Sequence, residues 1–201
     1  PHLWMDPGLW ALGVDVAKGA LAELAPECAE TLERNAERYR SQLLALDAWV
    51  EAAVTTIPEE NRTLVTAHDA FAYYARAYDL EVVGIQGVST EAEAGVADIR
   101  DTARLVVERR VPAMFMESTI SPRTVQAVVE AAAQQGHEVA IGDQLFSDAM
   151  GTQGTPEGTY IGMIRHNTAA IVTALGGSLP PLPAELDDWA ARWELPEASG
   201  E

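Results

Sequence analysis

The stretch RTLVTAHDAFAYYARAYDLEVVGIQGVS, residues 62–89, decides the fold of this chain. It contains two short apolar runs, Thr63–Ala67 and Glu81–Ile85, which are predicted strands. Between them lies a predicted helix over Ala70–Tyr78, for which Asp69 is the expected N-cap. A strand, a helix and a second strand in this order predict parallel pairing through a right-handed crossover. Such a sheet places its binding residues at the carboxyl ends of the strands.

The alternation of strands and helices continues toward the end of the chain. Two further apolar runs, Ala113–Met116 and Glu138–Ile141, are predicted strands. Start and stop signals predict helices from the capping-box pair Thr90 and Glu93 to Arg109, from Ser121-Pro122 to Gly136, and from Pro156 to Leu175. A loop of about residues 142–155 precedes the last helix. The predicted fold class is therefore α/β, with a four-stranded parallel sheet flanked by helices.

Two helices are predicted ahead of the sheet and one after it. Asp6 followed by Pro7 is a helix-start signal for a helix that runs to Leu24. A long helix is predicted over Pro26–Thr56, because its apolar residues recur at steps of three or four. At 1.5 Å per residue it would be a rod of roughly 45 Å. After a Pro-rich segment, a short amphipathic helix that packs on its own domain is expected from the spacing of Leu186, Trp189, Ala190 and Trp193.

Composition limits the classes of function. The chain has 201 residues, 48% of them hydrophobic, which suits one sizeable domain or a domain with pieces of another. The net charge of -18 disfavours nucleic-acid binding, because a phosphate backbone would be repelled. One cysteine leaves no intrachain disulfide, and no apolar run reaches the length of a membrane span. Since the chain starts with Pro1, the lack of a signal peptide says nothing about export.

Two imidazoles and a carboxylate stand where strands or helices should end: His2, His68 and Asp148. This mixture of donors is typical of a transition-metal site. His68 and Asp148 follow predicted strands at the carboxyl edge of the sheet, although a cap or a turn residue is an alternative for each. Glu117 ends the third strand at that edge. We expect it to support a ligand rather than to be one, because carboxylates commonly orient the imidazole N–H.

Other features favour structural interpretations. His137 precedes the fourth strand at the opposite edge of the sheet, and His166 lies in the middle of a predicted helix. The chain lacks a G-x-S-x-G elbow, a phosphate-binding glycine loop and an H-E-x-x-H motif. Catalysis therefore has weak support. The alternative to binding is a metal-dependent hydrolase in which His68 and Asp148 hold a catalytic ion and Glu117 is the one plausible base; a structural or adhesive domain is a third possibility.

Several runs, in order and correctly spaced, resemble one family. They are PHLWMDP at 1–7, the block RTLVTAHDAFAYYARAYDLEVVGIQGVSTEAEAG at 62–95, VPAMFMESTISPRTV at 111–125, LFSDAMG at 145–151 and GTPEGTYIGMIRHN at 154–167. Together they resemble the zinc/manganese substrate-binding proteins of bacterial ABC transporters, the extracytoplasmic metal-binding cluster. The resemblance covers nearly the whole chain.

The resemblance implies a division of the chain, since members of this family have two α/β lobes joined by one long helix, with the metal in the cleft between them. Residues 1–25 would be a remnant of the amino-terminal lobe, and residues 26–57 the linking helix between the lobes. Residues 58–178 would form the carboxy-terminal metal-binding lobe. Residues 179–201 would be a tail with the short helix. Trp10 and its neighbours would then be partly exposed.

The resemblance also implies roles for individual residues. His2 would be the second metal ligand, His68 the third and Asp148 the fourth, while the first ligand, a histidine of the amino-terminal lobe, has no counterpart here. Glu117 remains the candidate for supporting an imidazole. We expect His2 to be poorly held beside the chain end. We also expect weak metal binding by this chain alone and tight binding by a full-length parent.

The implied function is capture of Mn²⁺ or Zn²⁺ and its delivery to the membrane permease of an ABC transporter, without bond chemistry. The runs LFSDAMG and TAHDAF resemble those of the manganese-binding or mixed members, which slightly favours manganese, although the imidazole donors would suit zinc. Acid should release the ion, because the imidazoles must be neutral. The protein would be periplasmic or anchored at the cell surface as a lipoprotein, as in the adhesion-associated members. We expect a monomer that meets the membrane only through an anchor or the permease.

Overall fold

The computed structural model describes residues 1–91 and 94–195, and its centre is a sheet of four parallel strands in the order β2-β1-β3-β4. This confirms the predicted fold class. The register pairs Thr63 with Glu81 across β1 and β2, and Val65 with Met114 across β1 and β3. The strands are β1 (Thr63–His68), β2 (Glu81–Gln86), β3 (Ala113–Phe115) and β4 (Ala140–Ile141).

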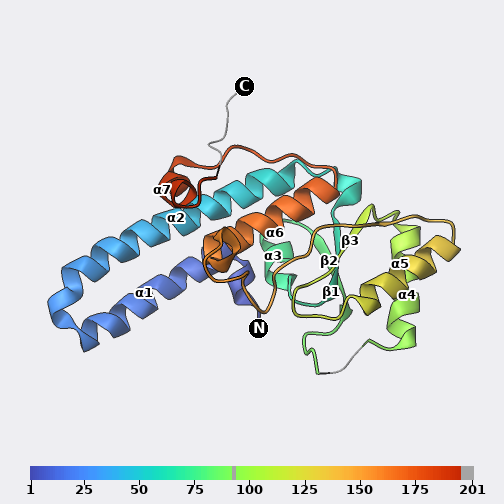
Figure 1. Cartoon of the computed structure of the whole chain (residues 1–201), viewed down its shortest axis with the longest axis horizontal. Helices are drawn as coiled ribbons and strands as arrows, with labels where there is room; N and C mark the ends of the chain where they lie inside the picture. The colour runs from blue at the N-terminus through green and yellow to red at the C-terminus, as the bar shows by residue number, and fades with distance from the viewer. Residues whose placement is uncertain (92–93, 196–201) are drawn as a thin grey trace.

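Helices cover both faces of the sheet (Figure 1). Because successive side chains of a strand point to opposite faces, neighbouring residues of β1 enter different cores. Leu64 joins the core under α2 (Ala29–Thr55), α3 and α6, whereas Val65 and Ala67 join the core under α4 and α5. The whole of β1 is buried, as expected of the central region of a parallel sheet. The helices are α3 (Ala72–Ala77), α4 (Val96–Glu108), α5 (Arg123–Gln134) and α6 (Tyr160–Ala174).

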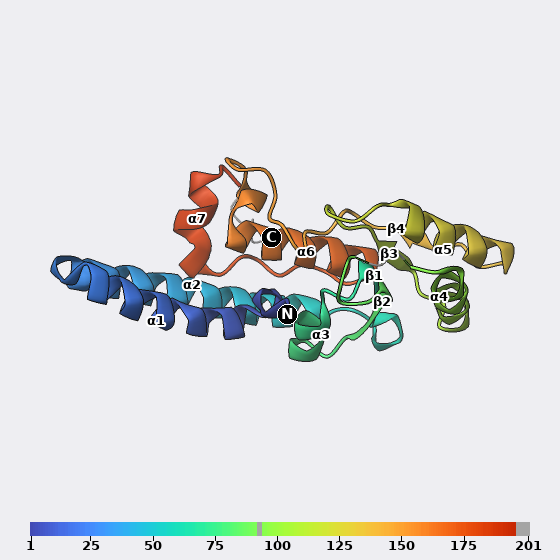
Figure 2. The same ribbon diagram turned by 90° about the horizontal axis from the view of Figure 1, so that it is seen from below.

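A helical hairpin precedes the sheet and extends away from it (Figures 1 and 2). It consists of α1 (Pro7–Leu24) and α2 (Ala29–Thr55). Asp6 caps α1 as predicted, because its carboxylate accepts a hydrogen bond of 2.9 Å from the backbone N–H of Leu9. The 27 residues of α2 make a rod of roughly 40 Å, and its buried residues gather in its second half. This half packs on α6, while the first half stands clear of the sheet with α1.

Short 3₁₀ turns occupy several junctions and move some predicted boundaries. The long helix was expected from Pro26, but a 3₁₀ turn covers Pro26–Cys28 and the α-helix begins at Ala29. The helix expected from Pro156 likewise begins with a turn over Pro156–Gly158, and Thr159 then caps α6. The other 3₁₀ turns are Leu3–Met5, Glu59–Asn61 and Ala184–Leu186.

Two predicted helix starts are wrong. Asp69 does not cap α3, which begins at Ala72 without a side-chain cap. Instead β1 continues through His68, and the Asp69 backbone N–H donates to the Gln86 carbonyl at 3.1 Å. The start of α4 is Val96 rather than Thr90, and the Asp98 carboxylate accepts from the Gly95 backbone N–H at 2.8 Å. The expected partner Glu93 lies outside the described residues.

The tail crosses back over the long helix. Its short helix, α7 (Asp187–Arg192), lies over α2 beside the start of α6 (Figure 2). Leu186 and Trp189 are buried in the core shared with α2 and α6, and the Trp189 indole donates to Thr159 Oγ1 at 3.1 Å. The tail helix therefore packs on its own domain, as predicted. Across the described ranges, no helix is both long and apolar enough to cross a bilayer.

Candidate metal centre

The three predicted ligands converge at the carboxyl edge of the sheet. One donor atom from each of His2, His68 and Asp148 lies within 4.8 Å of the others. His2 Nε2 is 3.0 Å from Asp148 Oδ1, and His68 Nε2 is 3.4 Å from Asp148 Oδ2. The two imidazole rings meet edge to face, with centroids 5.3 Å apart. The juxtaposition of His68 and Asp148, on which the sequence argument depends, is thus present.

His68 is held by Glu117 on two sides. The last residue of β1, His68 is fully buried, and its backbone N–H donates to Glu117 Oε1 at 2.8 Å. Its ring Nδ1 lies 2.6 Å from Glu117 Oε2. A carboxylate at this distance favours a proton on Nδ1, which leaves the lone pair of Nε2 directed at the site. Glu117 therefore takes the supporting position that the sequence suggested, beyond the end of β3.

The charge around His68 affects its protonation. Burial lowers the pKa of the imidazole, but the carboxylates of Glu117, Asp148 and Asp69 outweigh burial and raise the pKa above the ordinary 6.5. The metal-free imidazole therefore binds a proton more readily than an isolated histidine does. A metal ion bound here would need the neutral form, so a proton and the ion would compete for this residue.

His2 is fixed more firmly than expected. It is 6% exposed, and its carbonyl accepts a hydrogen bond of 3.1 Å from the Met5 backbone N–H. Its backbone adopts the left-handed region, with φ at 63°. This conformation is uncommon outside glycine, although histidine is among the residues that adopt it more often. The prediction that His2 would be poorly held is therefore wrong for this structure.

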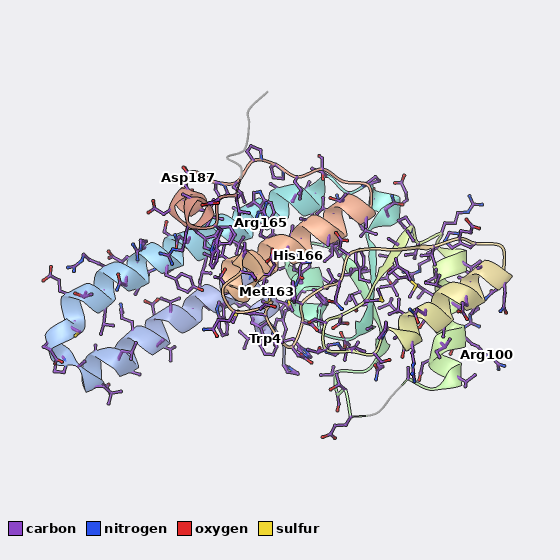
Figure 3. All side chains as sticks on the ribbon, in the orientation of Figure 1. Trp4, Arg100, Met163, Arg165, His166 and Asp187 are labelled. Atoms are coloured by element: carbon purple, nitrogen blue, oxygen red, sulfur yellow. The ribbon has the colours of Figure 1, made fainter. Side chains whose placement is uncertain are left out.

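Trp4 connects the His2 segment to the Asp148 loop. Its indole N–H donates to the Ser147 carbonyl at 3.0 Å, and its own carbonyl accepts from the Tyr160 hydroxyl at 2.7 Å. Its ring also contacts the His2 ring edge to face, with centroids 5.3 Å apart. Figure 3 shows Trp4 near the beginning of α6, far from Arg100 on α4. The sequence alone does not predict this role, because the bond crosses 143 residues and leaves no spacing signal.

The remaining histidines lie away from the site. His137 Nε2 is 2.9 Å from the Val111 carbonyl, at the opposite edge of the sheet. His166 Nε2 donates to the Gln144 carbonyl at 2.9 Å, and its ring packs on Phe146. Both make structural contacts, in line with their predicted interpretations. Within the described residues, His2, His68 and Asp148 form the one group of three or more such side chains close enough to share an ion.

The arrangement of these donors suits a cation but offers little for hydrolysis. Two neutral imidazoles and one carboxylate provide the nitrogen and oxygen donors that transition metals prefer. Asp148 is the most accessible of the three, since its side chain is 34% exposed while that of His2 is 8% exposed. Glu117, the base considered for a hydrolase, has both oxygens occupied by His68 and is 1% exposed. It is therefore not available to activate water.

Comparison with known proteins identifies the family. The family model described as zinc-uptake complex component A, periplasmic, matches residues 1–174. The chain belongs to this family of zinc/manganese substrate-binding proteins. It is 44% identical over 175 residues to the manganese-binding lipoprotein MntA of Bacillus subtilis and 46% identical over 175 residues to the zinc-binding protein TroA of Treponema pallidum. Each alignment covers 87% of this chain and 57% of the relative, so the chain spans little more than half of their length.

Solved structures of this zinc-uptake family agree with the fold. The periplasmic zinc-binding protein TroA from Treponema pallidum superposes with a TM-score of 0.85 at 46% identity, covering 87% of this chain and 63% of that chain. The Fe(III)-bound YtgA from Chlamydia trachomatis has a TM-score of 0.83 at 27% identity, covering 90% of this chain and 65% of that one. The four-stranded parallel sheet is therefore that of the family. The hydrolase alternative receives no support from these relatives.

Proposed function

We propose that this chain is the metal-binding part of an extracytoplasmic substrate-binding protein that captures Mn²⁺ or Zn²⁺ for an ABC transporter. The observation that supports this most directly is the approach of His2, His68 and Asp148 donor atoms to within 4.8 Å. The ion is the cargo of the protein, and it is delivered to the membrane permease without chemical change. We propose that the chain has no catalytic activity.

The donor set and the names of the relatives bear on whether the ion is manganese or zinc. MntA is named for manganese and TroA for zinc, while YfeA of Yersinia pestis is named for iron. Nitrogen donors give zinc the higher intrinsic affinity, whereas manganese prefers more oxygen ligands. We retain both ions as cargo, and we propose His2, His68 and Asp148 as their ligands with Glu117 orienting His68.

The proposed division of the chain follows the same family architecture. Residues 1–25 belong to an amino-terminal lobe, 26–57 to the linking helix, 58–178 to the carboxy-terminal lobe and 179–201 to the tail. In support, α1 and α2 enclose an apolar groove of about 450 Å³, and Trp10 at its rim is 37% exposed. Other apolar side chains of α1 are also exposed: Leu12, Val16, Leu21 and Leu24. Such a surface suits cover by further protein.

We further propose that the protein acts outside the cytoplasm, either periplasmic or anchored as a lipoprotein, as the names of the relatives suggest. Its partners are then the divalent ion and the permease. It acts as a monomer, and it meets the membrane only through an anchor or that permease. The high negative charge, -18 at neutral pH, raises the local concentration of cations near its surface.

The proposal is tested by calorimetric titration of this chain with Zn²⁺ and Mn²⁺ at neutral pH. We expect measurable binding that is weaker than nanomolar, because three protein ligands are present, and loss of binding in His68→Ala and Asp148→Ala. His137→Ala is the matched control, since it removes an imidazole at the opposite edge of the sheet and should leave binding unchanged. Metal binding that survives both substitutions at the site would reject the proposed ligands.

A further inference from the structure

Each of the three residues before Asp148 makes hydrogen bonds to a different part of the fold. The Leu145 backbone N–H donates to the Met116 carbonyl at 2.9 Å, and its carbonyl accepts from the Ser118 backbone N–H at 2.9 Å. Two residues on, the Ser147 carbonyl accepts from the Trp4 indole. Between them, Phe146 is held by a side chain of α6. Asp148 thus follows a short run of backbone whose position is defined from three directions.

The side chain that holds Phe146 is Asn167. Its Oδ1 accepts from the Phe146 backbone N–H at 2.9 Å, and its Nδ2 donates to the Phe146 carbonyl at 2.7 Å. The amide thereby pairs with the backbone much as a neighbouring strand would. Asn167 is fully buried in α6, so no solvent competes for these bonds. Removal of the amide would leave a buried donor and acceptor of the loop without partners.

The same helix also restrains Gln144, through the bond from His166. Adjacent residues of α6 therefore fasten alternate residues of the loop, although α6 supplies none of the three proposed ligands. A helix is stiffer than the loop of residues 142–155, and a ligand fixed beforehand loses less conformational entropy when an ion binds. The position of Asp148 relative to His68 then depends on a residue that does not itself reach the site.

We infer that Asn167 is a positioning residue for the metal ligand Asp148, acting through its two hydrogen bonds to Phe146. This inference rests on the proposed function. It predicts that Asn167→Ala weakens Zn²⁺ binding by about 10- to 100-fold, the range typical of residues that orient metal ligands. Binding is measured by titration well below the unfolding temperature, so that a loss of stability alone does not alter it.

A matched control lies next in the sequence. Thr168 is also fully buried on α6, but its hydroxyl bonds to the Tyr74 hydroxyl at 3.0 Å, away from the ligand loop. Thr168→Val should lower thermal stability and leave Zn²⁺ affinity unchanged. Asn167→Ser, which loses the two-point pairing with a smaller change in polarity, provides the same comparison if Asn167→Ala does not fold. Unchanged affinity in the folded Asn167 variant, or an equal loss in Thr168→Val, would overturn the inference.

A second measurement separates an effect on Asp148 from a general loss of Zn²⁺ affinity. In an Asp148→Asn background, which weakens the ligand itself, Asn167→Ala should cause no additional loss of affinity. The Co²⁺ absorption spectrum of Asn167→Ala should also change shape, because the carboxylate approaches the ion differently. If Asn167→Ala lowers Zn²⁺ affinity as much in the Asp148→Asn background as in the unmodified chain, Asn167 does not act through Asp148. Failure of the proposed function is distinguishable, because the unmodified chain itself would then bind no Zn²⁺ at this site.

Discussion

Replacing Glu117 by Gln tests how His68 is presented to the ion. The substitution keeps the size of the side chain, and its amide oxygen can still accept the His68 backbone N–H that Glu117 Oε1 now accepts at 2.8 Å. Its amide nitrogen would then stand where Oε2 lies, 2.6 Å from His68 Nδ1. An amide N–H donates, so Nδ1 would have to accept and the ring proton would move to Nε2. That proton would occupy the Nε2 lone pair that we propose binds the metal.

The expected loss of affinity follows from this change of tautomer. Disturbing a group that orients a ligating histidine costs about 10- to 100-fold in affinity, or ~1.4 to ~2.7 kcal/mol. The assay is calorimetric titration with Zn²⁺ at neutral pH, with Glu130→Gln as the control because Glu130 is exposed on α5. The pKa of His68 should also fall, since the charge of Glu117 contributes to raising it. Equal Zn²⁺ affinity in Glu117→Gln and Glu130→Gln would refute the reasoning.

Four further outcomes are expected. The pKa of His68 is raised above 6.5 in the folded protein. Protonation of His68 therefore stabilises the metal-free fold fully below pH 6.5, and this stabilisation is lost as pH rises through the folded pKa. Thermal unfolding measured against pH should show this dependence, and His68→Gln should abolish it. Metal affinity should move the opposite way and decline as pH falls through the same pKa, which titrations at several pH values would detect. Trp4→Phe keeps an aromatic ring, although a smaller one, and removes the donor to Ser147. It should destabilise the fold by at least about 1 kcal/mol and weaken Zn²⁺ binding, which urea unfolding and titration measure. Ile164→Ala should cost about 2–5 kcal/mol in urea unfolding, because Ile164 is fully buried between α6 and the sheet core.

The sheet could be predicted from sequence because its signals are local. The apolar runs at Thr63–Ala67 and Glu81–Ile85 are separated by a helix-forming segment of the length that a parallel crossover needs, and the observed strands begin where those runs begin. The helix boundaries were less predictable. Asp69 resembles an N-cap in sequence, but its backbone N–H is used to pair with Gln86, and the helix begins later. That competition depends on a neighbouring strand, which local propensity does not describe.

The candidate site likewise contains some residues that the sequence predicts and others that it does not. The shared edge of His68 and Asp148 follows from topology alone, since the carboxyl ends of parallel strands meet there. Glu117 could also be anticipated, because it lies just past β3 at that edge. Trp4 and Asn167 could not, since their bonds to the Asp148 loop join a side chain to backbone carbonyls or amides across 143 and 21 residues. Any loop sequence presents such backbone groups, so no residue pattern marks them.

The environment of His68 shows what a metal ion would add to this fold. Its Nε2 is buried and, within the described part of the chain, makes no hydrogen bond, although Asp148 Oδ2 lies 3.4 Å away. A buried polar atom without a partner costs free energy that the rest of the fold must offset. An ion between the imidazoles and the carboxylate would supply that missing partner and would also offset the negative charge of Asp148 and Glu117. Glu117 holds His68 in this position without an ion, so relief of this cost would add to the proposed metal affinity.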